Sequence, residues 1–128
     1  MQIGLGTVQF GIDYGIVNST KVSKDEVGKI LNFASENGVN LLDTASSYGC
    51  SEEVIGNNLN SKFNFNFITK TPLDLQDLTP ELHAQHIKKS LLNSLDLLKQ
   101  SQIYCLLVHR PNDLLSNSGN KIFNELVR

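Results

Sequence analysis

The sequence predicts an α/β fold, the N-terminal half of a (β/α)8 TIM barrel with about four βα units and parallel strands. Short apolar runs alternate with amphipathic helical patterns along the chain, which implies parallel strands joined by right-handed crossovers. Three of these runs end at an ionisable residue, Asp43, Lys70 or His109, and such barrels carry their chemistry at the C-terminal ends of the strands. The fold usually takes about 250 residues. Because the chain has 128, we expect residues 1–128 to form one incomplete barrel domain.

Composition places the chain among ordinary cytoplasmic proteins. The formal charge is −2 and 19% of the residues are charged, without the basic cluster that a nucleic-acid partner would favour. No apolar run approaches the ~20 residues of a membrane helix, and the start of the chain lacks the pattern of a signal peptide. The two cysteines, Cys50 and Cys105, are too few for a disulfide framework and lack metal-ligand spacing. We therefore expect reduced thiols, no metal, no nucleic acid and no membrane.

The first unit begins with a strand over residues 1–8, in which glycines alternate with larger residues. A loop over residues 9–22 follows, because it holds Gly, Asp and Asn. Ser23 then caps a helix, with Glu26 completing a capping box, and Gly38 ends it. The helix has one apolar face with the spacing i, i+3, i+4, i+7: Val27, Ile30, Leu31 and Ala34.

The second and third units follow the same order. Residues 39–43 form a strand, and Ser51 caps a short helix whose first-turn acids suit the helix dipole. Its apolar side comprises Val54, Ile55 and Leu59. Alternating phenylalanines at 63, 65 and 67 lead into a strand that ends at Lys70. Thr79 followed by Pro80 starts the next helix, as a capping hydroxyl followed by proline at the first helical position.

That long helix and the fourth strand complete the described pattern. Its expected inner face comprises Leu82, Ile87, Leu91, Leu95 and Leu98. His83 and His86 lie on the same helix and are expected to be solvated. Residues 102–108 form a nearly continuous apolar run, typical of a strand covered on both faces, and it ends at His109. A helix over residues 121–128 then begins, and no stop signal follows it. The pattern therefore predicts a barrel cut inside its fourth helix.

These motifs resemble a known enzyme family, the aldo-keto reductases. Residues 43–45, 48–49 and 51–56 resemble the family signature, and residues 5–11 its first strand and loop. Lys70, within 68–71, and His109, within 108–111, resemble its other two catalytic positions in the right order. The resemblance covers the whole chain. It implies an NADPH-dependent oxidoreductase that reduces an aldehyde or ketone to an alcohol, although the choice between NADP and NAD stays open.

The resemblance also implies a role for each of four catalytic residues. Tyr48 would donate the proton. Because a phenol has an ordinary pKa of about 10, the ammonium of Lys70 would favour its ionised form. Asp43 would hold Lys70, and His109 would hydrogen-bond the substrate carbonyl. Gly6, Thr7, Val8 and Asp43 would lie beside the cofactor, and no metal is required.

Each of these assignments has a plainer alternative. The plainer roles are a turn cap for Asp43, a surface tyrosine for Tyr48, a solvated lysine for Lys70 and a structural histidine for His109. For the whole chain, the alternatives are a truncated, non-catalytic remnant or interaction module, and a non-catalytic channel-associated subunit. The missing half of the barrel would supply most cofactor contacts. We therefore expect little or no activity from the chain alone, a small carbonyl compound as substrate, and self-association through open half-barrel edges.

Overall fold

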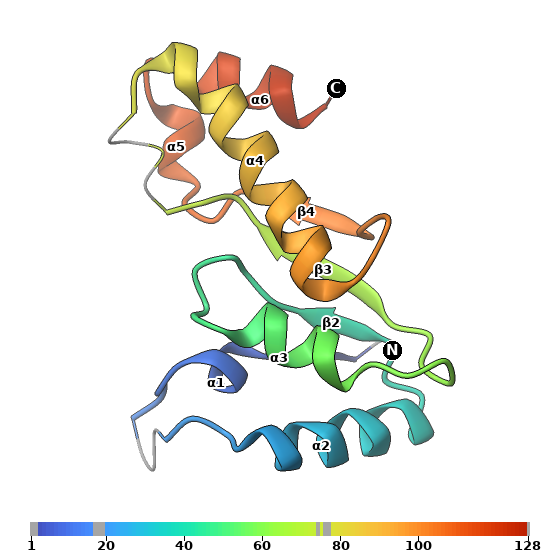
Figure 1. Ribbon diagram of the computed structural model, residues 1–128. Coiled ribbons are helices and arrows are strands. Elements are labelled where there is room, and N and C mark those ends of the chain that lie inside the picture. The colour runs from blue at the N-terminus through green and yellow to red at the C-terminus, as the bar shows by residue number, and fades with distance from the viewer. Residues whose placement is uncertain (1–2, 17–19, 74, 76–77, 128) are drawn as a thin grey trace.

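Four short parallel strands lie side by side in the order in which the chain makes them. The computed structural model describes residues 3–16, 20–73, 75 and 78–127 (Figure 1). The sheet has the order β1-β2-β3-β4, and each neighbouring pair is parallel. The strands are β1 (Gly4–Gly6), β2 (Leu41–Asp43), β3 (Asn66–Lys70) and β4 (Cys105–Leu107). This sequential, parallel order confirms the α/β fold predicted from the alternating pattern.

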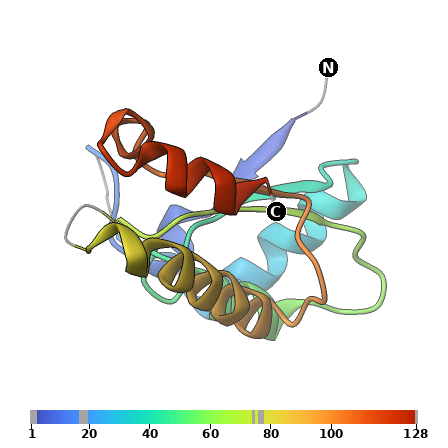
Figure 2. The same cartoon turned by 90° about the horizontal axis from the view of Figure 1, so that it is seen from above.

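Helices connect the strands and follow the last one. They are α1 (Val8–Gly11), α2 (Lys24–Glu36), α3 (Ser51–Asn58), α4 (Pro80–Leu98), α5 (Asn112–Leu115) and α6 (Gly119–Leu126). Ser23 caps α2 as expected, accepting a hydrogen bond from the backbone N–H of Glu26. Gly38 follows α2 with a φ of +74°, a conformation that glycine adopts without strain. Viewed from above, α6 lies beside α4 (Figure 2).

One face of the sheet packs against the helices and forms the main core. Leu42 and Phe67 are register partners on neighbouring strands, so their side chains point to the same face. They pack in one cluster with residues of α1, α2, α3 and α4. The other buried members are Phe10, Val27, Leu31, Val54, Ile55 and Leu98. A second cluster of Leu75, Ile87 and Ile122 joins α4 to α6.

The opposite face of the sheet is more open. Gly6, Asp43, Ile68 and Cys105 form one register row across the four strands. Gly6 is exposed and the other three are half-buried, while Leu107 at the β4 edge is 41% exposed. Since neither core cluster of the described residues includes this row, the side chains that point here remain accessible at the ends of the strands.

Several expectations about individual elements were wrong. The expected loop over 9–22 begins with the helical turn α1, because Phe10 is buried and anchors it. The strands are also shorter than predicted. Of the expected inner face of α4, Ile87 and Leu98 are buried and Leu91 and Leu95 half-buried, but Leu82 is 46% exposed and His83, expected to be solvated, is only 3% exposed. Met1 and Gln2 of the first predicted strand, residues 17–19 of the loop and Arg128 of the last helix lie outside the described residues.

Candidate functional site

An ion pair at the strand ends is the centre of the candidate site. Asp43 ends β2 opposite Ile68, and Lys70 lies two residues further along β3, so both side chains point to the open face. The ammonium of Lys70 pairs with Oδ1 of Asp43 and also donates to the Thr44 carbonyl at 2.9 Å. The Lys70 side chain is 13% exposed and that of Asp43 44%. A nearly buried ammonium is therefore held by two acceptors, one of which still faces solvent.

Tyr48 lies directly beside this ion pair. The Lys70 Nζ is 4.9 Å from the centre of the tyrosine ring, within range of a cation–π contact. The turn that carries Tyr48 depends on two glycines. Gly49 has a φ of +57°, and a Cβ at Gly11 would lie 1.6 Å from the Tyr48 carbonyl oxygen. The backbone of the turn is thus pressed against α1, which fixes the tyrosine next to Lys70.

His109 contacts Tyr48 from the side of β4. The two rings are 6.0 Å apart between centroids with an interplanar angle of 88°, a T-shaped arrangement that aromatic pairs favour. The backbone N–H of His109 donates to Thr71 Oγ1 at 3.0 Å, and its Nδ1 lies 3.3 Å from Ser47 Oγ. Burial lowers the pKa of His109 below its ordinary value of 6.5, and the charges of Lys70 and Arg110 lower it further. The imidazole is therefore neutral at neutral pH.

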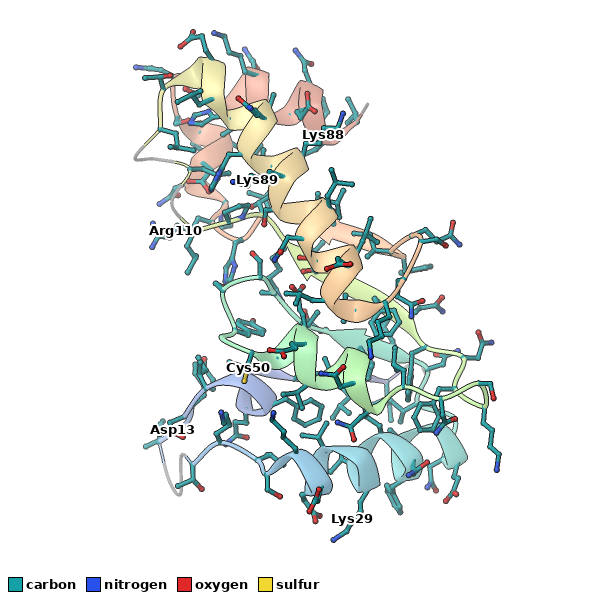
Figure 3. All side chains as sticks on the ribbon, viewed as in Figure 1. Asp13, Lys29, Cys50, Lys88, Lys89 and Arg110 are labelled. Carbon is teal, nitrogen blue, oxygen red and sulfur yellow. The ribbon has the colours of Figure 1, made fainter. Side chains whose placement is uncertain are left out.

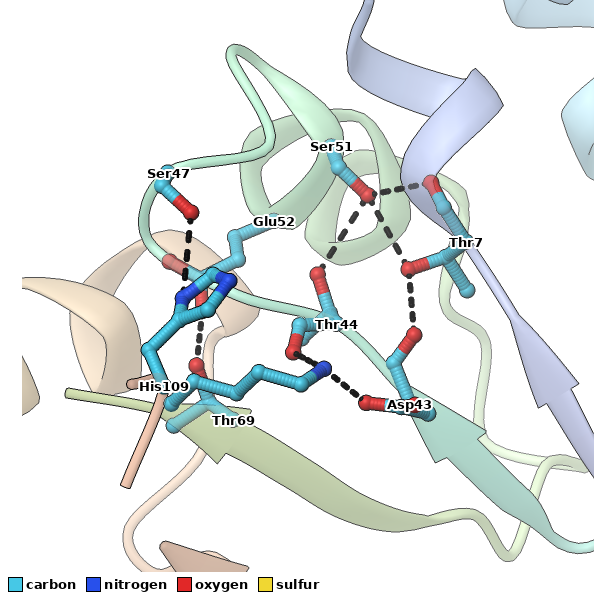
Figure 4. A network of polar contacts seen from close by, with 9 residues as sticks. Thr7, Asp43, Thr44, Ser47, Ser51, Glu52, Thr69 and His109 are labelled. Atoms are coloured by element: carbon cyan, nitrogen blue, oxygen red, sulfur yellow. Dashed lines mark hydrogen bonds and ion pairs between the residues drawn. The ribbon is translucent and has the colours of Figure 1, made fainter. Parts of the chain in front are cut away.

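A buried network of hydroxyl groups ties the tyrosine turn to β1 (Figure 4). Ser51 Oγ donates to the Thr7 carbonyl at 2.9 Å, and Thr44 Oγ1 donates to Ser51 Oγ at 3.3 Å. Thr7 Oγ1 in turn donates to the Asp43 carbonyl at 3.0 Å. Ser51 was expected to cap α3, but the helix begins at Ser51 with Cys50 before it and no side-chain cap. Its hydroxyl joins strands instead.

Glu52 supplies a second buried link that sequence reasoning missed. It is 2% exposed, and its Oε1 accepts a hydrogen bond from Thr69 Oγ1 at 2.7 Å. Thr69 adjoins Lys70 in β3, so this bond holds the N-terminus of α3 against the strand that carries the ammonium. The sequence showed Glu52 only as a first-turn acid. The link could not be read from it, because the partner is 17 residues away.

The residues expected beside a nicotinamide cofactor differ in their accessibility. A Cβ built at Gly6 would meet nothing within 4 Å, so open space lies over the end of β1, next to the half-exposed Asp43 carboxylate. Val8 is half-buried. Thr7 is fully buried and its hydroxyl is engaged with Asp43, which favours a positioning role over a direct contact.

Comparisons with known proteins bear on the family and the fold of the chain. The family model described as the aldo/keto reductase family matches residues 2–127. No curated protein sequence gives a match. Within the described part of the chain, no helix combines the length and the apolar character of a membrane span.

Solved structures with the same fold are (β/α)8 barrels of twice the length. A Pseudomonas aeruginosa protein, provisionally described as an aldo-keto reductase, is 32% identical with a TM-score of 0.77, and the match covers 97% of this chain and 49% of that one. A thermostable aldo-keto reductase in complex with the inhibitor epalrestat is 25% identical with a TM-score of 0.64, over 94% of this chain and 43% of that one. This chain thus spans about half the length of its structural relatives, and the predicted family and half-barrel fold are confirmed. This chain belongs to the aldo/keto reductase family.

Proposed function

We propose that the protein is an NADPH-dependent oxidoreductase that reduces the carbonyl of an aldehyde or ketone to an alcohol. The observation that supports this most is a single contact set. The ammonium of Lys70 touches both the Asp43 carboxylate and the ring of Tyr48, and His109 packs against the same ring. Proton transfer to a carbonyl oxygen is favoured where an acid, an ammonium, a phenol and an imidazole lie together at the ends of the strands.

In this proposal Tyr48 donates the proton to the carbonyl oxygen. Loss of the proton leaves a negative charge on the phenol, and the nearby ammonium of Lys70 stabilises it. Asp43 keeps Lys70 in place, because the ion pair and the Thr44 carbonyl together restrict where the ammonium can point. Asp43 is thus a positioning residue for Lys70 as well as a candidate cofactor contact.

His109 orients the substrate carbonyl. Its Nδ1 faces Ser47 Oγ at 3.3 Å, which leaves Nε2 for the substrate. If the serine hydroxyl donates to Nδ1, the neutral ring carries its proton on Nε2 and can donate to the carbonyl. Because burial and the nearby cations lower the pKa of His109, this neutral form is favoured at neutral pH. Ser47 therefore selects the tautomer in this proposal.

NADPH, when bound, would supply the hydride. The residues that fit it are Gly6, which leaves open space above the end of β1, and Asp43, whose half-exposed carboxylate can accept a ribose hydroxyl. Val8 and the buried Thr7 would support the same strand end. The family resemblance implies that the other barrel half supplies most contacts to the phosphates and the adenosine.

A mutation pair tests the catalytic role of the tyrosine. Tyr48→Phe removes the donor, and Tyr104→Phe removes a phenol that is 67% exposed and away from the site. Tyr48→Phe should reduce kcat by about 10²-fold or more, as expected for loss of a general acid, whereas Tyr104→Phe should not change it. NADPH oxidation at 340 nm with an aromatic aldehyde gives the rates. A wild-type rate above the uncatalysed background that Tyr48→Phe leaves unchanged would refute the proposal.

The alternative of a non-catalytic remnant or interaction module is favoured by the chain's span of about half its relatives' length. We therefore propose that the 128 residues alone have little or no activity and that the edges of β1 and β4 allow self-association. Size-exclusion chromatography with light scattering, together with NADPH fluorescence, tests both statements. A monomer that binds NADPH with micromolar affinity contradicts them. Oligomers without cofactor binding, indifferent to Tyr48→Phe, favour the alternative.

A further inference from the structure

His109 also lines a cavity whose walls include neither Asp43 nor Lys70. Its volume is about 520 Å³, within the range of roughly 300–1,000 Å³ that small-molecule sites occupy. The loop after β4 and the short helix α5 form its walls. The lining residues are His109, Arg110, Pro111, Asn112, Asp113 and Ser116. A substrate whose carbonyl reaches His109 can extend into this cavity.

The accessible charge in this cavity is positive. Arg110 is half-buried, and among residues 3–16, 20–73, 75 and 78–127 its guanidinium has no ion-pair partner. Figure 3 shows Arg110 on the side of the molecule where the strands end. Asp113 also lines the cavity but is only 5% exposed, so little of its carboxylate is available to a ligand. An anionic group in the cavity can therefore pair with the guanidinium.

The positive charge of Arg110 also affects the pKa of His109, its neighbour in the sequence. The charge of Arg110 contributes to the lowered pKa of His109, together with burial and Lys70. Both residues line the same cavity, so a small molecule held there by the imidazole can also be reached by the guanidinium. Its planar fork of N–H donors matches the two oxygens of a carboxylate or phosphate.

We propose that this cavity selects carbonyl substrates that carry an oxyanion, a carboxylate or a phosphate, which Arg110 binds while His109 holds the carbonyl. The inference rests on the proposed reductase function and adds the substrate class. Arg110 is the specificity-determining residue, and its contribution is to binding of the anion and not to the proton transfer itself.

Matched substrates test this class. 4-Carboxybenzaldehyde and its methyl ester differ in one negative charge, and glyceraldehyde 3-phosphate and glyceraldehyde test the phosphate arm. For each pair we expect wild-type kcat/KM to favour the charged compound at least about tenfold, the effect of one hydrogen bond to a charged group. Arg110→Gln should bring that ratio near one, chiefly by lowering kcat/KM for the charged compound. Lys88→Gln removes an exposed charge on α4 and should change neither value.

A binding measurement separates the failure of this inference from the failure of the proposed function. Benzoate and benzamide are titrated into the isotope-labelled protein, and NMR follows the His109 imidazole and the Arg110 guanidinium. Benzoate alone should shift both signals, and the His109 shift should vanish in Arg110→Gln. If Tyr48→Phe abolishes activity but Arg110→Gln keeps the preference for charge, the inference is wrong and the reductase function stands. If no aldehyde is reduced, the titration decides, and the absence of a benzoate effect overturns the inference.

Discussion

Replacing Gly56 by alanine should destabilise the protein, because α3 and α4 approach each other at this glycine. A Cβ at Gly56 would lie 2.0 Å from the Leu97 carbonyl oxygen, which belongs to the backbone of α4. No side-chain rotation can relieve that contact. The two helices must move apart, and α3 also carries Ser51 and Glu52, which tie the tyrosine turn to β1 and β3.

The size of the effect follows from two opposing contributions. Overpacking of a tight contact costs about 1–3 kcal/mol, and the shortness of this backbone contact favours the upper end. Alanine regains about 1 kcal/mol through its better helix propensity. We therefore expect the free energy of unfolding to fall by about 2 kcal/mol.

Gly28→Ala is the matched control in another helix. A Cβ at Gly28 would lie 2.8 Å from Asn58 Oδ1, the end of a side chain that can rotate away. The helix-propensity gain of up to about 1 kcal/mol should then dominate, so this variant should be as stable as wild type or more stable.

Urea denaturation followed by circular dichroism measures both variants. The midpoint should fall for Gly56→Ala and stay or rise for Gly28→Ala, with similar m values, so that the change reflects stability and not compactness. If Gly56→Ala is as stable as wild type, or if Gly28→Ala is the more damaging change, the helix contact described here is wrong.

Three further predictions concern polar groups of the core and of the candidate site. The pKa of His109 is lowered in the folded state, so the unfolded chain binds more protons between that lowered value and about 6.5, and the free energy of unfolding should rise with pH over this range. His109→Asn should lack this rise in a plot of urea midpoint against pH. An unchanged plot would contradict the assignment. Thr69→Val leaves the buried Glu52 carboxylate without its hydroxyl donor and should lower the free energy of unfolding by about 1.5–3 kcal/mol. Glu52→Gln, which can still accept the hydrogen bond, should lower it less. The reverse order of the urea midpoints would count against this link. His83→Leu removes a buried ring whose Nε2 lies 2.7 Å from a backbone carbonyl and should cost about 1–3 kcal/mol. Gln85→Ala, on the exposed side of the same helix, should leave the free energy of unfolding within about 0.5 kcal/mol of wild type. Equal effects of Gln85→Ala and His83→Leu would show that the His83 ring makes no net contribution to stability.

The sequence was sufficient for the sheet and for the group of candidate site residues. Parallel strands with ionisable residues at their ends place those residues at one edge, so Asp43, Lys70 and His109 could be brought together without coordinates. Tyr48 came from the resemblance to the family signature, and the structure has its ring beside Lys70. The strand-end residues needed only local patterns and one rule of topology.

The sequence was insufficient where a side chain depends on a distant partner. His83 was expected to be solvated, but the loop before α4 offers it the Leu75 carbonyl, which makes burial of the ring tolerable. Ser51 was assigned to its own helix because capping is a local rule, whereas its partner Thr7 is 44 residues away. Arrangements of this kind depend on how the units pack, which a pattern along one chain does not specify.

The Asp43–Lys70 ion pair lies on the open face of the sheet and is partly exposed to solvent. Its strength therefore depends on what covers that face. Opposite charges about 4 Å apart attract by only about 1 kcal/mol in bulk water and several times more where the effective dielectric constant is near 20. Expulsion of water by a bound molecule or an apposed protein surface would therefore strengthen the hold on the ammonium beside Tyr48. In the proposed reaction, binding of the reactants would itself strengthen the interaction between Asp43 and Lys70.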